Sequence, residues 1–246
     1  MAHYTIPDLA TQQEVLSLGD YDLRVTNLAR FIYRKIRRNK GRLLDVGCGN
    51  GLVLRFFKRR GFDVTGMELS KDLCDVMREN PKMEEIVIIQ GDISQKKGNG
   101  TYDVVLASDV IEHIDDDRKA LQNLFTFVKQ GGLLVVTVPA HAFLFGRRDE
   151  TWGHYRRYNK KDLRDKLSDL NGKLEFVTYW NFFGFFAYYF FEKILQKPIK
   201  EDFRYEDTSV SKFTRSFLDG LLKAEELFGF SPIGLTLVAG IRKRDT

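Results

Sequence analysis

The sequence predicts an α/β fold built on a doubly wound, mostly parallel seven-stranded sheet. Short apolar segments that read as strands alternate with amphipathic segments, which is typical of βα units. A glycine-rich turn follows the first of these strands, as in nucleotide-binding α/β domains. The 246 residues suit one domain. We expect an N-terminal helical cap (1–40), a Rossmann-like core (41–181 and 232–246) and a helical insertion or lid (182–231) before the last strand.

The composition is that of an ordinary globular protein, with 43% hydrophobic and 30% charged residues. The net charge of +5 is compatible with an anionic substrate or membrane surface but does not require one. The two cysteines, Cys48 and Cys74, do not have the spacing of a disulfide framework or a metal site. We therefore expect no metal and a reducing, cytoplasmic compartment. The N-terminus lacks the apolar region of a secretory signal.

Two helices are expected before the first strand, over residues 8–18 and 21–40. The second carries an apolar stripe at helical spacing, which predicts a face that packs on the core. The stripe consists of Leu23, Leu28, Phe31, Ile32 and Ile36. Gly41 is expected to end this helix.

The segment 43–51, LLDVGCGNG, reads as a strand and a glycine turn, and residues 52–60 read as the following helix. Gly47, Gly49 and Gly51 allow the backbone to approach a ligand closely. The helix start then offers free N–H groups to polar or anionic ligands. The GxGxG spacing, preceded by Asp45, differs from the GxGxxG of dinucleotide-binding folds. A purely structural strand-to-helix turn is the alternative.

Acidic residues follow the next predicted strands. The strand 62–67 ends at Glu68, where a carboxylate can accept hydrogen bonds from two ribose hydroxyls. Asp92 follows the strand 86–90, and Ser108 and Asp109 follow the strand 102–107. Ligands of open parallel sheets bind outside the carboxyl ends of the strands, so these side chains should meet there. The alternatives are an ordinary helix start for Glu68 and an ordinary turn for Asp92.

The second half of the sheet follows the same rules. Residues 116–130 form an amphipathic helix that Gly131 and Gly132 are expected to end. Residues 133–140 are almost continuously apolar, which indicates a strand buried on both faces. The last two strands are expected over 174–179 and 235–241.

These segments resemble, in order and context, the motifs of class I S-adenosylmethionine-dependent methyltransferases. LLDVGCGNG resembles their first motif, and YDVVLASDVIEH resembles the fourth motif of small-molecule methyltransferases, including those of ubiquinone biosynthesis. The resemblance covers residues 43–138. It implies S-adenosyl-L-methionine as the cofactor, S-adenosyl-L-homocysteine as the product, and an antiparallel last strand.

The resemblance also implies a cofactor site, residue by residue. Asp92 would meet the adenine amino group, with Ile93 beside the ring, and the backbone near Ser108 would line the methionine moiety. Arg24 is a candidate for the cofactor's carboxylate, which a guanidinium can pair bidentately, although a surface role is equally open. The expected cofactor-binding set is Arg24, Asp45, Gly47, Cys48, Gly49, Gly51, Glu68, Leu69, Asp92, Ile93, Ser108 and Asp109.

A loop rich in basic and aromatic residues, 140–158, follows the fifth strand and resembles the "HD…GH.RRY" stretch of a set of class I methyltransferases. Some of that set are associated with saccharide or lipid-linked polymer pathways. Arginines can clamp an anionic group, and a histidine can accept a proton. The expected substrate-binding residues are Arg147, Arg148, Tyr155 and Arg156. The candidate catalytic bases, in order, are His154, His141 and His113. A basic surface loop, and a structural role for His113, are the alternatives.

The aromatic segment 182–191 is too short to span a bilayer, which requires about 20 residues. It could pack over the active site as a lid, contact a membrane surface through residues 182–195, or form a dimer contact. A further amphipathic helix is expected over 211–230.

The sequence thus predicts a methyltransferase that methylates an oxygen of a small-molecule, lipid-linked or saccharide acceptor. We expect a cytoplasmic monomer or homodimer, with peripheral membrane contact as an option. A nucleic-acid methyltransferase is one alternative because the chain is basic. However, base-amino methyltransferases carry an N/D-P-P-Y/F element where SDVIEH stands here, so no nucleic-acid partner is expected. A non-catalytic S-adenosylmethionine-binding protein is the other alternative.

Overall fold

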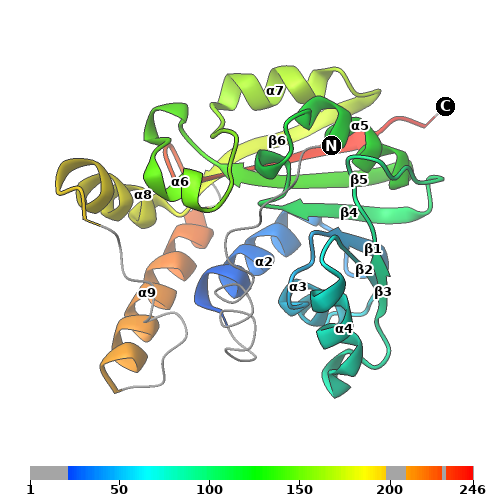
Figure 1. The fold of residues 1–246 in the computed structure, drawn as a ribbon, viewed down its shortest axis with the longest axis horizontal. Coiled ribbons are helices and arrows are strands. Elements are labelled where there is room, and N and C mark those ends of the chain that lie inside the picture. The colour runs from blue at the N-terminus through cyan, green and yellow to red at the C-terminus, as the bar shows by residue number, and fades with distance from the viewer. Residues whose placement is uncertain (1–21, 198–208, 229–230, 246) are drawn as a thin grey trace.

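A seven-stranded sheet forms the centre of the molecule, and helices cover both of its faces (Figure 1). The computed structural model describes residues 22–197, 209–228 and 231–245. The strand order is β3-β2-β1-β4-β5-β7-β6, and β7 runs antiparallel to both of its neighbours. The other neighbouring pairs are parallel. The predicted doubly wound sheet with an antiparallel last strand is confirmed.

The elements alternate along the chain as the apolar pattern predicts. The strands are β1 (Gly41–Val46), β2 (Phe62–Glu68), β3 (Val87–Gln90), β4 (Tyr102–Ser108), β5 (Val128–Pro139), β6 (Gly172–Trp180) and β7 (Thr236–Lys243). The α-helices are α2 (Leu23–Ile36), α3 (Leu52–Lys58), α4 (Lys71–Glu79), α5 (Asp117–Phe127), α6 (Arg147–Thr151), α7 (Lys160–Ser168), α8 (Phe182–Tyr188) and α9 (Ser209–Phe228). Three 3₁₀ turns are η1 (Pro81–Met83), η2 (Ile111–His113) and η3 (Ala142–Leu144), and η4 (Tyr189–Ile194) is a π-helix.

Helix α2 begins and ends through its own local chemistry. The Asp22 side chain accepts a hydrogen bond from the N–H of Val25 at 2.9 Å, which caps the N-terminus. The helix ends because Arg37 adopts a left-handed conformation with φ of 53°. The prediction that Gly41 ends this helix is therefore wrong, since Gly41 opens β1 instead. All five residues of the predicted stripe are buried. The helix expected over 8–18 lies outside the described residues.

The boundary between α5 and β5 also differs from the prediction. Helix α5 ends at Phe127, and the extended, fully buried Val128 already pairs with Tyr102 of β4. The glycines therefore lie inside the strand, where Gly131 takes a φ of +66° at an irregularity of the β4–β5 register. The strand pairing of Val128 with Tyr102 thus ends the helix earlier than the apolar spacing of the sequence predicts.

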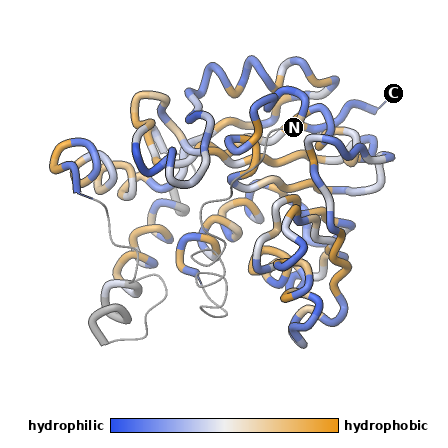
Figure 2. Tube along the Cα trace, viewed as in Figure 1, coloured by the Kyte–Doolittle hydropathy of each residue, from blue (hydrophilic) through white to orange (hydrophobic). Residues whose placement is uncertain are grey.

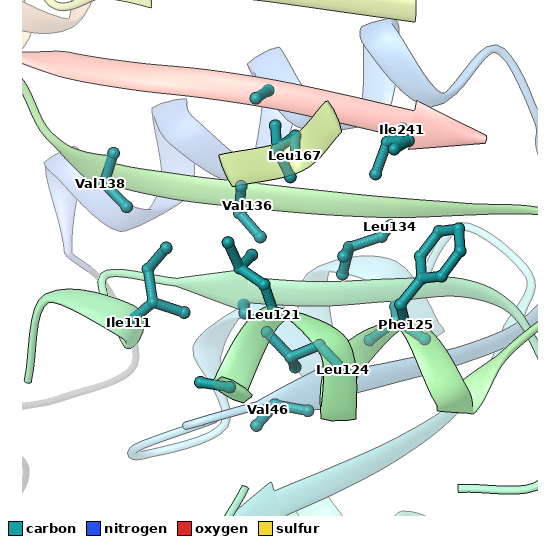
Figure 3. Close-up of a cluster of buried hydrophobic side chains, with 14 of the residues drawn as sticks. Val46, Ile111, Leu121, Leu124, Phe125, Leu134, Val136, Val138, Leu167 and Ile241 are labelled. Carbon is teal, nitrogen blue, oxygen red and sulfur yellow. The ribbon is translucent and has the colours of Figure 1, made fainter. Parts of the chain in front are cut away.

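Two hydrophobic clusters hold the helices to the sheet. On one face, α5 and α7 pack onto β1, β4, β5 and β7, as Figure 3 shows for Leu121, Leu124, Leu167 and Val136. On the other face, α2, α3 and α4 pack against the same strands, together with Leu222 of α9. Figure 2 shows hydrophobic residues along the strands and a largely hydrophilic α7. With both faces covered, ligands can reach the sheet only at its ends.

The segment after β6 forms a helical layer beside α2. Helix α8 continues directly into the π-helix η4. The N–H of Phe182 donates to Glu225 of α9 at 2.8 Å, and Asn27 of α2 donates to Asp219 of α9 at 2.9 Å. Among the described residues, none of the helices has the length and apolar character needed to cross a bilayer.

Candidate active site

A cavity of about 1070 Å³ opens at the carboxyl ends of β1, β2 and β4. Helices α2, α8 and α9 complete its wall. Most of the predicted site residues line it: Arg24, Asp45, Gly47, Cys48, Gly49, Glu68, Leu69, Asp92, Ile93, Ser108, Asp109, His113, Arg148, His154 and Tyr155. Predicted residues that do not line it are Gly51, His141, Arg147 and Arg156.

The glycine turn after β1 adopts a backbone that favours glycine. Gly47, Gly49 and Gly51 have φ values of +70°, +53° and +75°. A Cβ atom on Gly47 would lie 2.5 Å from Cγ2 of Val110, a separation that requires a neighbour to move. The N–H of Gly47 donates to the carbonyl of Met67 at 2.8 Å, which fixes the turn to β2. The turn thus presents bare backbone to the cavity.

Glu68 at the end of β2 bridges the glycine turn and the start of α4. Its Oε2 accepts from the N–H of Gly49 at 3.0 Å, and its Oε1 accepts from the N–H groups of Leu69 and Ser70 at 2.8 and 3.1 Å. A carboxylate has about four lone-pair sites, so with three of them used, Oε2 can still accept a hydrogen bond from a ligand hydroxyl. Asp92, after β3, accepts from the N–H of Ser94 at 2.8 Å and so forms a turn of its own.

Asp45 lies beneath the glycine turn and is almost completely buried. Burial, aided by the nearby Glu68 carboxylate, raises the pKa of Asp45 to about 8. Its Oδ2 has no hydrogen-bond partner among the described residues. The side chain is therefore protonated at neutral pH in the ligand-free chain, and a cationic ligand group would favour its ionised form.

Arg24 of α2 reaches across the cavity to the end of β4. Its Nη2 lies 2.7 Å from Oδ2 of Asp109, and Thr137 donates to Oδ1 of Asp109 at 3.3 Å. Burial acts to raise the pKa of Asp109, but the charge of Arg24 and its hydrogen bond outweigh burial and lower it. Asp109 also has a φ of 53°, which is uncommon outside glycine. The arginine predicted to bind the cofactor's carboxylate is thus already placed by a carboxylate of the chain.

A cluster that the sequence did not predict as a unit lies beside this pair. Glu112 and His113 of η2 meet His154 from the loop after α6, and one potential ligand atom from each lies within 4.8 Å of the others. The two imidazole rings meet edge to face, with centroids 4.6 Å apart. Glu112 is fully buried, and neither carboxylate oxygen has a hydrogen-bond partner among the described residues. These three side chains could hold a metal ion, which the cysteine spacing alone did not indicate.

The loop after β5 holds His154 through a buried ion pair. Nδ1 of His154 lies 3.0 Å from Oδ1 of Asp149, and Nε of Arg157 donates to both oxygens of Asp149 at 2.7 and 2.8 Å. Sequence reasoning missed Glu112, Asp149 and Arg157. One signal was available for Glu112, because a carboxyl group between Ile111 and Ile114 in an apolar turn indicates a buried acid.

The other predicted loop residues lie elsewhere. His141 has a buried ring that stacks on Tyr179 and contacts the carbonyl of Gly234 through Nε2 at 3.0 Å. Arg156 pairs with the buried Asp117 at 3.0 Å. Arg147 is exposed at the start of α6, whereas Arg148 lines the cavity and lies 3.5 Å from Glu192.

The sequence and the fold of this chain are similar to those of known methyltransferases. A family model described as a methyltransferase domain matches residues 20–168. The ubiquinone biosynthesis O-methyltransferase of Rickettsia canadensis is 31% identical over 101 residues, which are 40% of this chain and 43% of that protein. The chain thus spans less than half the length of this curated relative.

Solved structures share the fold at low sequence identity. An S-adenosylmethionine-dependent methyltransferase from Mesorhizobium loti has a TM-score of 0.58 at 17% identity, over 86% of this chain and 96% of that one. Phosphoethanolamine N-methyltransferase 2 of Haemonchus contortus, in complex with S-adenosyl-L-methionine, has a TM-score of 0.59 at 18% identity. That match covers 89% of this chain and 53% of the other.

Proposed function

The chain belongs to the methyltransferase-domain family, and from this premise we propose that it transfers the methyl group of S-adenosylmethionine to an oxygen of an amphipathic small-molecule acceptor. One observation carries the proposal. A single cavity joins the glycine turn, where the methyl donor binds in this fold, to the partly buried Glu112–His113–His154 cluster. Donor and acceptor can therefore meet without crossing bulk water, which favours a displacement reaction.

The cofactor half rests on groups at three successive strand ends. The glycine turn, Glu68 and Asp92 offer backbone N–H groups and carboxylates suited to the methionine part, the ribose and the adenine, respectively. We assign Arg24 to the methionine carboxylate, and Asp45 to the cationic end of the same moiety. This assignment explains why a buried carboxyl group whose Oδ2 has no partner among the described residues lies beneath the turn.

The acceptor half has a polar end and an apolar wall. The polar end is the Glu112–His113–His154 cluster. The wall is formed by side chains of α8 and α9 and of the chain leading into β7: Phe183, Ala187, Tyr188, Leu218, Leu221, Leu222 and Leu235. An acceptor with a hydroxyl-bearing head and a hydrocarbon body fits both features. Helices α8 and α9 then serve as the substrate cover.

The reaction balances without a covalent enzyme intermediate. The acceptor oxygen forms a bond to the methyl carbon while the carbon–sulfur bond breaks, and its electron pair remains on sulfur in neutral S-adenosylhomocysteine. The hydroxyl proton must leave the acceptor, and proton acceptors at the cluster suit this requirement. Among the predicted bases, His154 and His113 lie in the cavity, whereas His141 does not, so we assign it no catalytic role.

Helix α8 and the π-helix η4 also carry exposed aromatic side chains, which bear on the source of the acceptor. Phe183 and Tyr188 of α8 line the cavity, whereas Phe186 and Phe190 on the same layer are about half exposed. Phenylalanine and tyrosine side chains are stabilised at a membrane interface. We propose that this surface contacts a bilayer that holds a lipid-linked acceptor. A Phe186→Ser/Phe190→Ser variant should sediment less with phosphatidylglycerol–phosphatidylcholine vesicles. Val76→Ser, on α4 at the other end of the molecule, should not change sedimentation (Figure 1).

A direct test combines binding with turnover. We expect micromolar binding of S-adenosylhomocysteine by calorimetry, and transfer of tritiated methyl groups to a phenol or alcohol that carries a hydrocarbon chain. The same head group without the chain should be a poorer acceptor. Ala187→Trp, which places a large ring in the apolar wall, should reduce turnover of the chain-bearing acceptor and leave S-adenosylhomocysteine binding unchanged. Cofactor binding with no methylation across such acceptors would instead support a non-catalytic binding protein.

A further inference from the structure

The Glu112–His113–His154 cluster has the composition of a metal site as well as that of a proton relay. The three side chains come from two segments, η2 and the loop after α6, and their ligand atoms lie within 4.8 Å of one another. Two ligand atoms bound to one ion at about 2.1 Å in tetrahedral geometry are roughly 3.4 Å apart. Small side-chain rotations would therefore bring these atoms to coordination distance.

Glu112 supplies an independent observation that points to a cation. Its side chain is fully buried and lines the cavity, and both carboxylate oxygens are without a hydrogen-bond partner among the described residues. Burial, followed by the nearby charge of Asp109, raises the pKa of Glu112 well above its ordinary range. A buried carboxyl group without a partner is costly, and native structures seldom keep one without a function.

His113 supplies a second imidazole next to Glu112. Its ring meets the ring of His154 edge to face, with centroids 4.6 Å apart, and both histidines line the cavity. A metal ion binds an unprotonated imidazole nitrogen, so the two rings offer two nitrogen ligands beside the Glu112 carboxyl group.

His154 is oriented in the way metal-bound histidines are. With Nδ1 facing Asp149 at 3.0 Å, Nε2 is left as the acceptor nitrogen of the ring. Asp149 is itself fixed by Arg157 and by the N–H of Gly146 at 3.1 Å. A carboxylate behind a histidine fixes the tautomer and makes the exposed nitrogen a better ligand.

We propose that Glu112, His113 and His154 bind one divalent cation, with open coordination positions that face the cavity. Two imidazoles and one carboxylate favour a transition-series ion such as Zn²⁺ or Mn²⁺ over Mg²⁺, which prefers oxygen ligands. Asp149 and Arg157 act as positioning residues through His154.

The site also has a consequence that rests on the proposed function. An acceptor hydroxyl in an open position would have its pKa lowered by the cation, and its proton would pass to solvent water. The histidines would then serve as ligands and not as bases. A second hydroxyl or carbonyl oxygen next to the first could fill another position, so acceptors with two adjacent oxygens should bind best.

Untagged full chain, freed of metal with a chelator and dialysed, is titrated with Co²⁺ and with Zn²⁺. We expect one ion per chain by calorimetry and visible Co²⁺ absorption bands, which report nitrogen and oxygen ligands. Glu112→Gln, His113→Ala and His154→Ala should each weaken binding at least tenfold, and Asp149→Asn should weaken it roughly 10- to 100-fold. His141→Ala is the matched control, because this buried histidine lies off the cavity, and it should bind like the wild type.

A thermal readout does not depend on activity. Glu112→Gln keeps the shape of the side chain and removes the carboxyl group that would bind the ion, so without metal it should be about as stable as the wild type. Zn²⁺ should raise the melting temperature of the wild type and leave that of Glu112→Gln unchanged.

Absence of stoichiometric binding, or binding retained in both Glu112→Gln and His154→Ala, would overturn the metal site. Binding of S-adenosylhomocysteine is measured separately. A chain that binds it but no cation contradicts only this inference, whereas a chain that binds a cation but neither S-adenosylmethionine nor its product contradicts the proposed function.

Discussion

Glu68→Gln is the substitution that isolates ribose recognition most cleanly. The carboxylate accepts three backbone N–H groups, from Gly49, Leu69 and Ser70. Oε2, which accepts only one of these N–H groups, retains a lone pair for a hydroxyl of a bound ribose. Glutamine has the same shape but only one accepting oxygen. Its amide N–H groups would face backbone N–H groups, which are also donors.

The magnitude follows from the hydrogen bonds that are lost. A hydrogen bond to a charged group contributes about 1.5–3 kcal/mol. Loss of one ribose hydrogen bond should therefore weaken S-adenosylhomocysteine binding roughly 10- to 150-fold. The product is the better probe, because it lacks the sulfonium charge and so reports the ribose and adenine contacts with less electrostatic contribution.

The assay is isothermal calorimetry with S-adenosylhomocysteine, with circular dichroism to check folding. Asp63→Asn is the matched control, since Asp63 is an exposed acid on the same strand, β2, and does not line the cavity. It should change the dissociation constant less than twofold. A Glu68→Gln chain that folds normally and binds within twofold of the wild type would refute the ribose assignment.

The remaining predictions concern the other walls of the cavity. Arg24→Gln should weaken the binding of S-adenosylhomocysteine roughly tenfold, but it should not change the binding of methylthioadenosine, which lacks the carboxylate. Equal losses of affinity for both ligands in calorimetry would contradict the assignment of Arg24 to the methionine carboxylate. Gly47→Ala should destabilise the chain by about 1–3 kcal/mol more than Gly153→Ala in urea unfolding, because φ is +70° and +71° but only Gly47 meets Val110. The pKa of Asp45 is raised to about 8 in the folded chain. The contribution of this carboxyl group to the free energy of unfolding is therefore fully present below its pKa in the unfolded chain, and it is lost as pH rises toward 8. The stability of Asp45→Asn relative to the wild type should therefore rise by up to about 1.4 kcal/mol per pH unit up to pH 8 and level off above; parallel unfolding curves would contradict this.

The sheet could be predicted from the sequence because its signals are local. Apolar runs, the glycine turn at Gly47 and the acids at Glu68 and Asp92 each lie within a few residues of the element they define. Parallel strands then bring those separate ends to one edge without further information. The same local reasoning failed at Val128, where pairing with Tyr102, 26 positions earlier in the chain, extends β5 into the predicted helix.

The acceptor side could be predicted only in part because its contacts are distant in sequence. Glu112 and His154 are separated by 42 positions and meet only after η2 and the loop after α6 fold onto the same wall. The low pKa of His113 depends on burial and on His154, which no single segment reveals. The composition of the loop 140–158 predicted a functional loop but not which of its residues face the cavity, and the fold pairs Arg156 with Asp117 and places His141 off the cavity.

Four of the carboxyl groups that line the cavity fall into two kinds, and the difference indicates what the site binds. Asp109 and Asp149 each pair with an arginine of the chain, Arg24 and Arg157. Asp45 and Glu112 are as deeply buried as the arginine-paired Asp149, but each leaves at least one oxygen without a partner among the described residues. Burial raises the pKa of both groups, so each becomes an ionised carboxylate only when a positive charge binds beside it. The ammonium group of S-adenosylmethionine would bring such a charge to Asp45 at the glycine turn. At Glu112, the positive charge is the one that the proposed cation supplies.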